Sequence, residues 1–304
     1  RDQYPEQTGF VALPMDMEYM AAGPVKNRYR DQVVELAGIK QNNPSTFFPF
    51  IFADPRRMRA TPDNEKGNQP GDKPYFSYTA VNGEVKLGDC FMAGFLEGEN
   101  AFSGIKIYPA LGYFPFDETL LPLWKYAADK EIPVLTHCIR GTIFYRGRKE
   151  DQWNRHPVFM QAKGNQEYEP LLLPEMDNVN FSINFTHPLN YLCLLDEYLL
   201  RQWVGKCSTE TKKLFGYTDN NTALLYNLRN LKLCFGHYGG EDEWARFFEL
   251  DRDLHSIQLV KKPGHGLDFL FNDKQTELKG KPEQIWKDAD WYTIISSLIY
   301  QYPN

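Results

Sequence analysis

The chain has 304 residues and a formal net charge of −6, from 34 Lys and Arg against 40 Asp and Glu. With 42% hydrophobic and 15% aromatic residues it has the material for a large core, which excludes disorder as its main state. The negative balance argues against nucleic acid or an anionic membrane as a partner, because no basic face is available to release counterions. No apolar run approaches the roughly 18 residues of a membrane-spanning helix. We therefore expect a soluble globular protein that binds neither nucleic acid nor membrane.

Apolar runs and helical periodicity alternate along the chain. The runs predict strands at 10–15, 47–53, 104–108, 132–136 and 231–235. They are continuous rather than alternating, as is typical of strands covered on both faces in a parallel sheet. Pro49 inside the second run indicates an end or an irregular position. Amphipathic spacing predicts helices at 117–130, with Asp117 as N-cap, at 289–302, and in a segment that starts at Pro188.

The alternation of strand and helix predicts an α/β fold with a parallel sheet. Two insertions, 140–185 and 241–288, are rich in charge, glycine, proline and aromatic residues. Each follows a strand and so leaves the carboxyl edge of the sheet, where α/β folds build their sites. No GxGxxG or GxxxxGK[ST] motif follows a strand, so nucleotide binding has no support. Five parallel strands would suffice for a flavodoxin-like open sheet, but that fold requires neither long insertions nor strands that end in histidine.

The cysteines predict a reducing compartment. They are odd in number and scattered, with no CxxC spacing, which fits neither a disulfide framework nor a thiolate zinc site. They stand at Cys90, Cys138, Cys193, Cys207 and Cys234. We therefore expect a cytoplasmic protein. Because the chain opens on Arg1 and closes on Asn304 directly after a predicted helix, we expect a fragment cut at both ends, and an upstream targeting segment stays open.

Three polar side chains stand inside or directly after the predicted strands. His137 follows the run at 132–136, and His237 follows the run at 231–235. Two imidazoles from neighbouring strands at the carboxyl edge have the spacing to share a metal ion. Lys106 lies among apolar neighbours, where an ammonium is costly to bury unless it is paired, neutralised or bound. The alternative for each is a structural role, as a hydrogen-bonded core histidine or a salt-bridged lysine.

Further candidates could contact a substrate. Arg56 and Arg57 follow the strand at 47–53, and Arg140 opens the first insertion. An arginine fork binds a carboxylate or phosphate bidentately, although such residues also occur on solvated loop faces. His187 precedes a predicted helix and could reach the mouth of the sheet, the alternative being a capping role. His156 lies in a polar insertion, and we expect it to be exposed.

Several segments resemble the amidohydrolase superfamily of metal-dependent hydrolases, in the branch of amidohydrolase-related barrels that includes decarboxylases. The carriers are SGIKIYPALGYFP (103–115), WKYAADKEIPVLTHCIRG (124–141) and LKLCFGHYGG (231–240), with weaker likenesses at LPMDM (13–17), FADPRR (52–57) and ADWYTIISSLIYQYPN (289–304). The phrase KIYPA at 106–110 is similar to strand four of dihydroorotase-like members, where the lysine is carboxylated and bridges two metals.

The resemblance implies a partial (β/α)8 TIM barrel holding about strands 2–6 with their helices. Residues 1–304 would form a single incomplete domain, open because both ends are truncated, with the two insertions at its catalytic face. Two family features are missing. Nothing before Phe10 supplies the His-x-His pair of the first strand, and the chain ends before the eighth strand, which carries a metal-binding Asp in the family.

The resemblance also implies a divalent metal, with Zn²⁺ favoured and one or two ions bound. His137 would be a ligand, and His237 either a ligand or the residue that positions the catalytic water. Lys106 would bridge two metals if carboxylated; unmodified, it would leave a mononuclear site and orient the substrate. The predicted function is hydrolysis of a C–N or C–O bond in a small polar substrate through a metal-activated water, the fragment itself being inactive. The alternatives are a metal-dependent decarboxylase and a non-catalytic, metal-free barrel. Whether the chain forms a homo-oligomer stays open.

Overall fold

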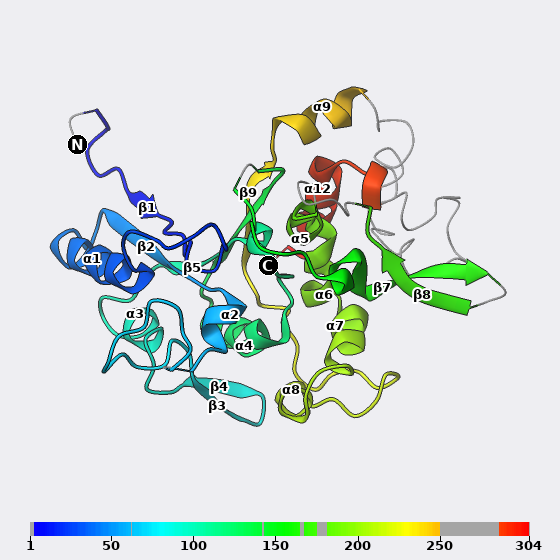
Figure 1. Cartoon of the computed structure of the whole chain (residues 1–304), viewed down its shortest axis with the longest axis horizontal. Coiled ribbons are helices and arrows are strands. Elements are labelled where there is room, and N and C mark those ends of the chain that lie inside the picture. The colour runs from blue at the N-terminus through cyan, green and yellow to red at the C-terminus, as the bar shows by residue number, and fades with distance from the viewer. Residues whose placement is uncertain are drawn as a thin grey trace.

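A parallel sheet of five strands organises the protein. The computed structural model describes residues 3–61, 63–141, 143–164, 167–174, 181–249 and 286–303. The strand order is β1-β2-β5-β6-β9, and the sheet is curled (Figure 1). The bounds are Phe10–Ala12 for β1, Phe47–Phe52 for β2, Gly104–Ile107 for β5, Val134–Ile139 for β6 and Leu233–Gly239 for β9. All neighbouring pairs are parallel, so the carboxyl ends of the strands share one edge.

Two antiparallel hairpins interrupt the succession of parallel strands. The first pairs β3 (Tyr78–Val81) with β4 (Glu84–Leu87), and the second pairs β7 (Arg155–Gly164) with β8 (Glu167–Leu172). Asn82 and Gly83 form the turn of the first hairpin with φ angles of 50° and 77°. Positive φ at both central residues is the conformation that two-residue hairpin turns favour.

The prediction of a partial (β/α)8 barrel is wrong, although the α/β class and the parallel sheet are found. The parallel strands are not consecutive strands of the chain, because the β3–β4 hairpin stands between β2 and β5 and the β7–β8 hairpin between β6 and β9. Among the described residues β1 and β9 form the two edges of an open sheet. The physical reason is local pairing. The strands β3 and β4, and the strands β7 and β8 within the predicted insertion 140–185, satisfy their backbone hydrogen bonds with each other instead of joining the parallel sheet.

Helices and short 3-10 turns cover the sheet. Four contacts position the core: α1 packs against β2, α5 packs against β6, and α12 packs against both β9 and α9. The α-helices are α1 (Tyr29–Asn42), α2 (Pro55–Met58), α3 (Ala93–Leu96), α4 (Leu121–Asp129), α5 (Ile183–Thr186), α6 (Leu192–Leu195), α7 (Glu197–Val204), α8 (Thr209–Phe215), α9 (Glu241–Glu249) and α12 (Trp291–Gln301). The 3-10 helices are η1 (Pro109–Leu111), η2 (Glu118–Leu120), η3 (Asp151–Asn154) and η4 (Pro188–Tyr191). None of the described helices combines the length and the apolar character that crossing a bilayer requires.

The predicted elements exist with shifted boundaries. Asp117 is an N-cap as expected, but of η2, which leads into α4; its carboxylate accepts a hydrogen bond from the Thr119 backbone N–H. Pro188 starts η4 before the chain becomes α-helical at Leu192. The strands β6 and β9 run farther than the apolar runs suggested, so that both candidate histidines lie within them.

A close approach between two central strands depends on one glycine. Gly104 opens β5 beside Phe50 of β2. A Cβ atom at this position would stand 2.3 Å from the Phe50 ring and 2.7 Å from the carbonyl oxygen of Pro133. Both distances are shorter than carbon contacts allow, so a side chain here would push the strands of the sheet apart.

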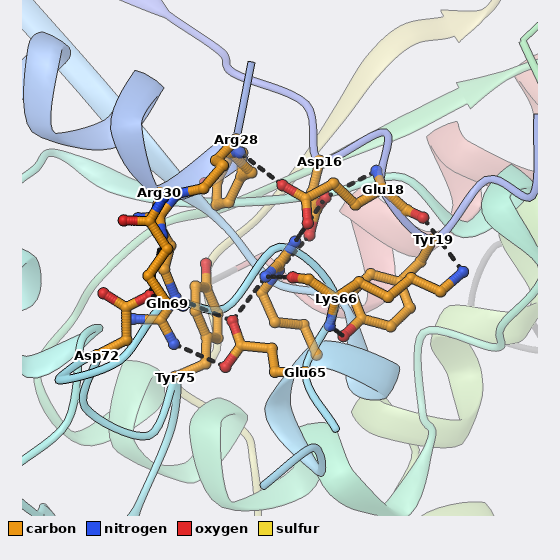
Figure 2. A network of polar contacts seen from close by, with 12 residues as sticks. Asp16, Glu18, Tyr19, Arg28, Arg30, Glu65, Lys66, Gln69, Asp72 and Tyr75 are labelled. Carbon is orange, nitrogen blue, oxygen red and sulfur yellow. Dashed lines mark hydrogen bonds and ion pairs between the residues drawn. The ribbon is translucent and has the colours of Figure 1, made fainter. Parts of the chain in front are cut away.

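A buried ion network joins the segment after β1 to α1, α2 and the loop before β3 (Figure 2). Arg57 of α2 is 1% exposed. Its guanidinium binds Asp16 with Nε (2.5 Å), Glu65 with Nη1 (2.6 Å) and Glu18 with Nη2 (3.0 Å). Arg30 of α1 binds Glu65 from the other side at 2.7 Å. Burial alone would lower the pKa of Arg57, but the hydrogen bond and the charge of Asp16 raise it above its usual value.

We expect Arg57→Ala to lower the free energy of unfolding by about 3–5 kcal/mol, because it leaves buried carboxylates without the cation that pairs with them. Urea denaturation measures the change. The matched control is Lys73→Ala, which removes an exposed ion pair to Asp89 and should cost less than about 1 kcal/mol. Equal midpoints for the two variants would contradict the structural role of the network.

Candidate active site

The register of the parallel strands brings the three sequence-predicted candidates together. Lys106 pairs with Leu135, and Leu135 pairs with Cys234, so these residues form one row across β5, β6 and β9. His137 stands two residues farther along β6, opposite Gly236. Because side chains alternate in a strand, His137 lies on the same face as this row and one step nearer the carboxyl edge. The opposite face of β6 is buried, so this face is the one that offers a site.

His237 reaches His137 from the end of β9. The two imidazole rings lie 4.5 Å apart between centroids, at an angle of 74°. His237 is exposed and has a φ of 67°, a conformation that L-residues with side chains rarely adopt. Its carbonyl accepts a hydrogen bond from the Gly240 N–H at 2.9 Å, which closes the turn. Local strain of this kind gathers at functional sites, and here it holds the second imidazole against the first.

The Lys106 amine is buried without a counter-charge. The residue is 4% exposed, and the part of the chain that the structure describes supplies it with neither a hydrogen bond nor an ion pair. Burial lowers the pKa of Lys106 to about 8, an effect that Cys234 opposes weakly. At neutral pH most of the amine still carries a proton, but a larger fraction than in an exposed lysine is uncharged and nucleophilic.

His137 is a neutral imidazole over the whole physiological range. Burial, the charge of Lys106 and the proximity of His237 lower its pKa to about 3. A neutral imidazole is the form that binds a metal ion. The electrostatics of the cluster thus favour a ring nitrogen with a free lone pair.

Tyr108 is a member of this site that sequence reasoning missed. Its ring lies 4.1 Å from that of His137, and its hydroxyl donates to the Ile143 carbonyl oxygen at 3.0 Å. Burial raises the pKa of Tyr108 to about 12, so the phenol keeps its proton. The signal was present in the sequence: Tyr108 is two residues after Lys106 and therefore on the same face of the chain.

The arginine candidates lie outside the cluster, in ion pairs. Arg57 belongs to the buried network around Asp16. Arg56 binds the Asp54 carboxylate with two nitrogens, at 2.9 and 2.6 Å. Arg140 binds Glu243 at 2.6 Å. Contact between these arginines and a substrate stays a prediction, and their observed partners are carboxylates of the chain itself.

His187 packs into the core beneath α12. Its ring stacks on Trp286 at 4.0 Å, and its Nε2 lies 2.9 Å from the carbonyl oxygen of that residue. Nδ1 accepts a hydrogen bond from the Leu189 N–H at 3.2 Å. Both ring nitrogens are thus engaged within the chain, which is the capping role that the sequence left open; its contact with substrate stays a prediction.

Among the residues that the structure describes, two side chains of the usual metal-binding types, His137 and His237, meet in the cluster. Among the described residues no three His, Cys, Asp or Glu side chains gather in a group that could hold a metal. The donors that the described part of the chain brings together here are two imidazoles and one lysine amine. Much of the insertion predicted at 241–288 falls outside the described residues, as do His255 and His265.

Comparison of the chain with protein-family models, curated proteins and solved structures finds no match. The function is therefore argued from the side chains and their geometry.

The shifted pKa of His137 predicts an acid-dependent loss of stability. Between pH 6.5 and about 3 the unfolded chain binds a proton at this residue and the folded chain does not, so the free energy of unfolding falls as pH drops through this window. His137→Gln should make that fall shallower, as measured by urea denaturation at pH 7, 6, 5 and 4. An unchanged slope would show that the folded protein protonates His137 at its ordinary pKa.

Proposed function

We propose that this chain is a metal-dependent hydrolase that cleaves a C–N or C–O bond in a small polar substrate. The observation that carries the proposal is the contact between the His137 and His237 rings at the carboxyl edge, with the Lys106 amine buried on the same face. The resemblance of the segments around these three residues to metal-dependent hydrolases supports it.

The donor set fits a divalent ion with one modification. Imidazole nitrogen suits Zn²⁺, and catalytic zinc sites combine three protein ligands with one open position. His137 and His237 supply two nitrogens. Lys106 supplies a third donor as a carbamate: the neutral amine adds to CO₂, an N–C bond forms, and one proton is released to solvent. Burial promotes this reaction, because only the unprotonated amine attacks CO₂.

A bound divalent metal would supply Lewis acidity, which lowers the pKa of a water molecule and polarises a carbonyl group. The chain's own residues prepare the site for it. Burial keeps His137 deprotonated, and the turn after β9 aims His237 at the same point. The Tyr108 phenol keeps its proton, and its bond to the Ile143 carbonyl ties the start of the first insertion to the rim of the site.

Metal content by elemental mass spectrometry tests the proposal, after reconstitution with Zn²⁺ in bicarbonate buffer. We expect about one equivalent or more in the wild-type chain, lost in His137→Ala and in His237→Ala because each removes a nitrogen donor. His187→Gln is the matched control: it alters a buried histidine whose ring nitrogens bond within the chain, and should keep its metal. A wild-type chain that takes up no metal would overturn the proposal and leave the non-catalytic alternative.

The role of Lys106 has a separate test. Lys106→Arg keeps a cation but forms no carbamate, so it should lose the bicarbonate dependence of metal uptake. Lys125→Met, which alters a lysine paired with Asp129 on α4, should retain that dependence. Uptake that is independent of bicarbonate in the wild type would mean an unmodified Lys106. Product analysis then separates the two chemistries, since a decarboxylase releases CO₂ and a hydrolase does not.

A further inference from the structure

A cavity of about 700 Å³ lies beside the sheet, between loops that leave the carboxyl ends of β2, β5 and β6. Arg56 lines it from α2 and Arg59 from the C-terminal end of this helix. Phe114 lines it from the segment after η1, and Trp153 and Arg155 from η3 and β7. None of Lys106, His137 and His237 lines it. Pockets of this size at this edge are where α/β proteins bind small molecules.

Fixed aromatic rings form one wall of the cavity. Phe114 meets Phe185 edge-on at 4.8 Å between centroids, and Trp153 meets the same Phe185 at 5.1 Å with an interplanar angle of 90°. Phe114 also stacks on Phe116 at 5.1 Å. These contacts hold the rings in place. Phe114 and Phe185 are themselves buried, so the ring surface that a planar ligand could stack on is that of the half-buried Trp153.

His156 belongs to this wall and is fully buried, which contradicts the expectation that it is exposed. Its Nδ1 accepts hydrogen bonds from the backbone N–H groups of Val158 (3.1 Å) and Phe159 (2.9 Å). The proton is therefore on Nε2, which donates to the Asn190 amide oxygen at 3.0 Å. The imidazole is therefore neutral and, being fully buried, packs behind the wall without adding a charge to the cavity.

Three guanidinium groups supply the polar side of the cavity. Arg56 is held by Asp54, and Arg59 binds Asp117 at 3.0 Å. Arg155 has the loosest partner, Glu169 at 3.6 Å across the hairpin. Nε and Nη2 of Arg56 and of Arg59 are bonded within the chain, which leaves Nη1 of each without a partner among the described residues. Arg155 uses Nη1 for Glu169 and for the Pro170 carbonyl oxygen, so its Nε and Nη2 keep the planar fork that binds carboxylates.

Two carboxylates also line the cavity, and both have partners. Asp117 binds Arg59 and caps η2, and Glu150 accepts a hydrogen bond from the Gln152 side chain. The lining therefore carries three guanidinium groups against two carboxylates. Asp54 and Glu169, which pair with Arg56 and Arg155 from outside the lining, balance the remaining charge, so an incoming anion would be bound by unoccupied N–H groups and not by a net positive charge.

We propose that this cavity is a binding site for a planar aromatic carboxylate, with the ring against the Phe114–Trp153 wall and the carboxylate on the arginines. The site is separate from the Lys106–His137–His237 cluster and needs no metal. The experiments below therefore test this binding site independently of the proposed hydrolase function.

Titration calorimetry with 2-naphthoate tests the proposal on the metal-free protein. Two matched probes separate the contributions: 2-naphthalenemethanol keeps the rings without the charge, and cyclohexanecarboxylate keeps the charge without the aromatic plane. We expect 2-naphthoate to bind at least about tenfold more tightly than either, since a charge-assisted hydrogen bond and ring stacking each contribute on the order of one kcal/mol or more. Equal affinity for all three probes, or no saturable binding of 2-naphthoate, would overturn the assignment.

Arg155→Gln locates the carboxylate. The side chain is half exposed and weakly paired, so the variant should fold, and it should weaken 2-naphthoate about tenfold while leaving 2-naphthalenemethanol unchanged. Arg59→Gln should act in the same direction. Arg229→Gln, an exposed arginine outside the cavity, should leave binding as in the wild type. Undiminished binding in both cavity variants would place the anion elsewhere.

His137→Ala tests whether the two sites are separate. This variant should bind 2-naphthoate as the wild type does, whatever its metal content, and a loss of binding would contradict a separate site.

Discussion

The parallel register of β5, β6 and β9 is the constraint on which the candidate active site depends. Residues far apart in the chain become neighbours because each strand hydrogen-bonds to the next in one alignment. A slip of one residue in β6 would turn His137 to the buried face and bring Thr136 or Cys138 into its place. The hydrogen bond from Cys138 to the Thr186 carbonyl and the burial of Thr136 against Tyr191 oppose that slip from the other face.

At the other end of the sheet, a buried network of ion pairs holds the neighbouring segments together. Arg57 gathers the carboxylates of Asp16, Glu18 and Glu65, and thereby ties the chain after β1 to α2 and to the loop before β3. The network contains two arginines and three carboxylates. These segments cannot shift easily relative to one another, because a displaced side chain would leave a buried charge without a partner. Arg57 is of a residue type that often binds substrate, but in this network the carboxylates of the same chain occupy its guanidinium. Arg56, one residue earlier, faces a cavity instead.

Local patterns in the sequence were reliable for element type and poor for the way the elements combine. The five apolar runs are strands of the parallel sheet, and Asp117 is an N-cap. The barrel expected from the family resemblance is absent from the described sheet, since hairpins stand between its strands. The Asn82-Gly83 pair is a local sequence signal for the β3–β4 hairpin, but apolar runs alone do not predict that hairpin. His156 was misjudged because the charge around it in sequence does not predict its contact with Phe159 and Asn190.

The sequence by itself determined the class of the fold and the candidates Lys106, His137 and His237, because apolar run length and the polar residues at strand ends are local properties. Only the tertiary structure decided which candidates meet. It put His137 and His237 in ring contact, left Lys106 without a counter-charge, and placed Arg57, Arg140 and His187 in internal bonds. It also assembled a cavity from loops that are distant in the chain. These outcomes depend on register and on side-chain packing, which are sums over many nonlocal contacts and are not encoded in the spacing of any one segment.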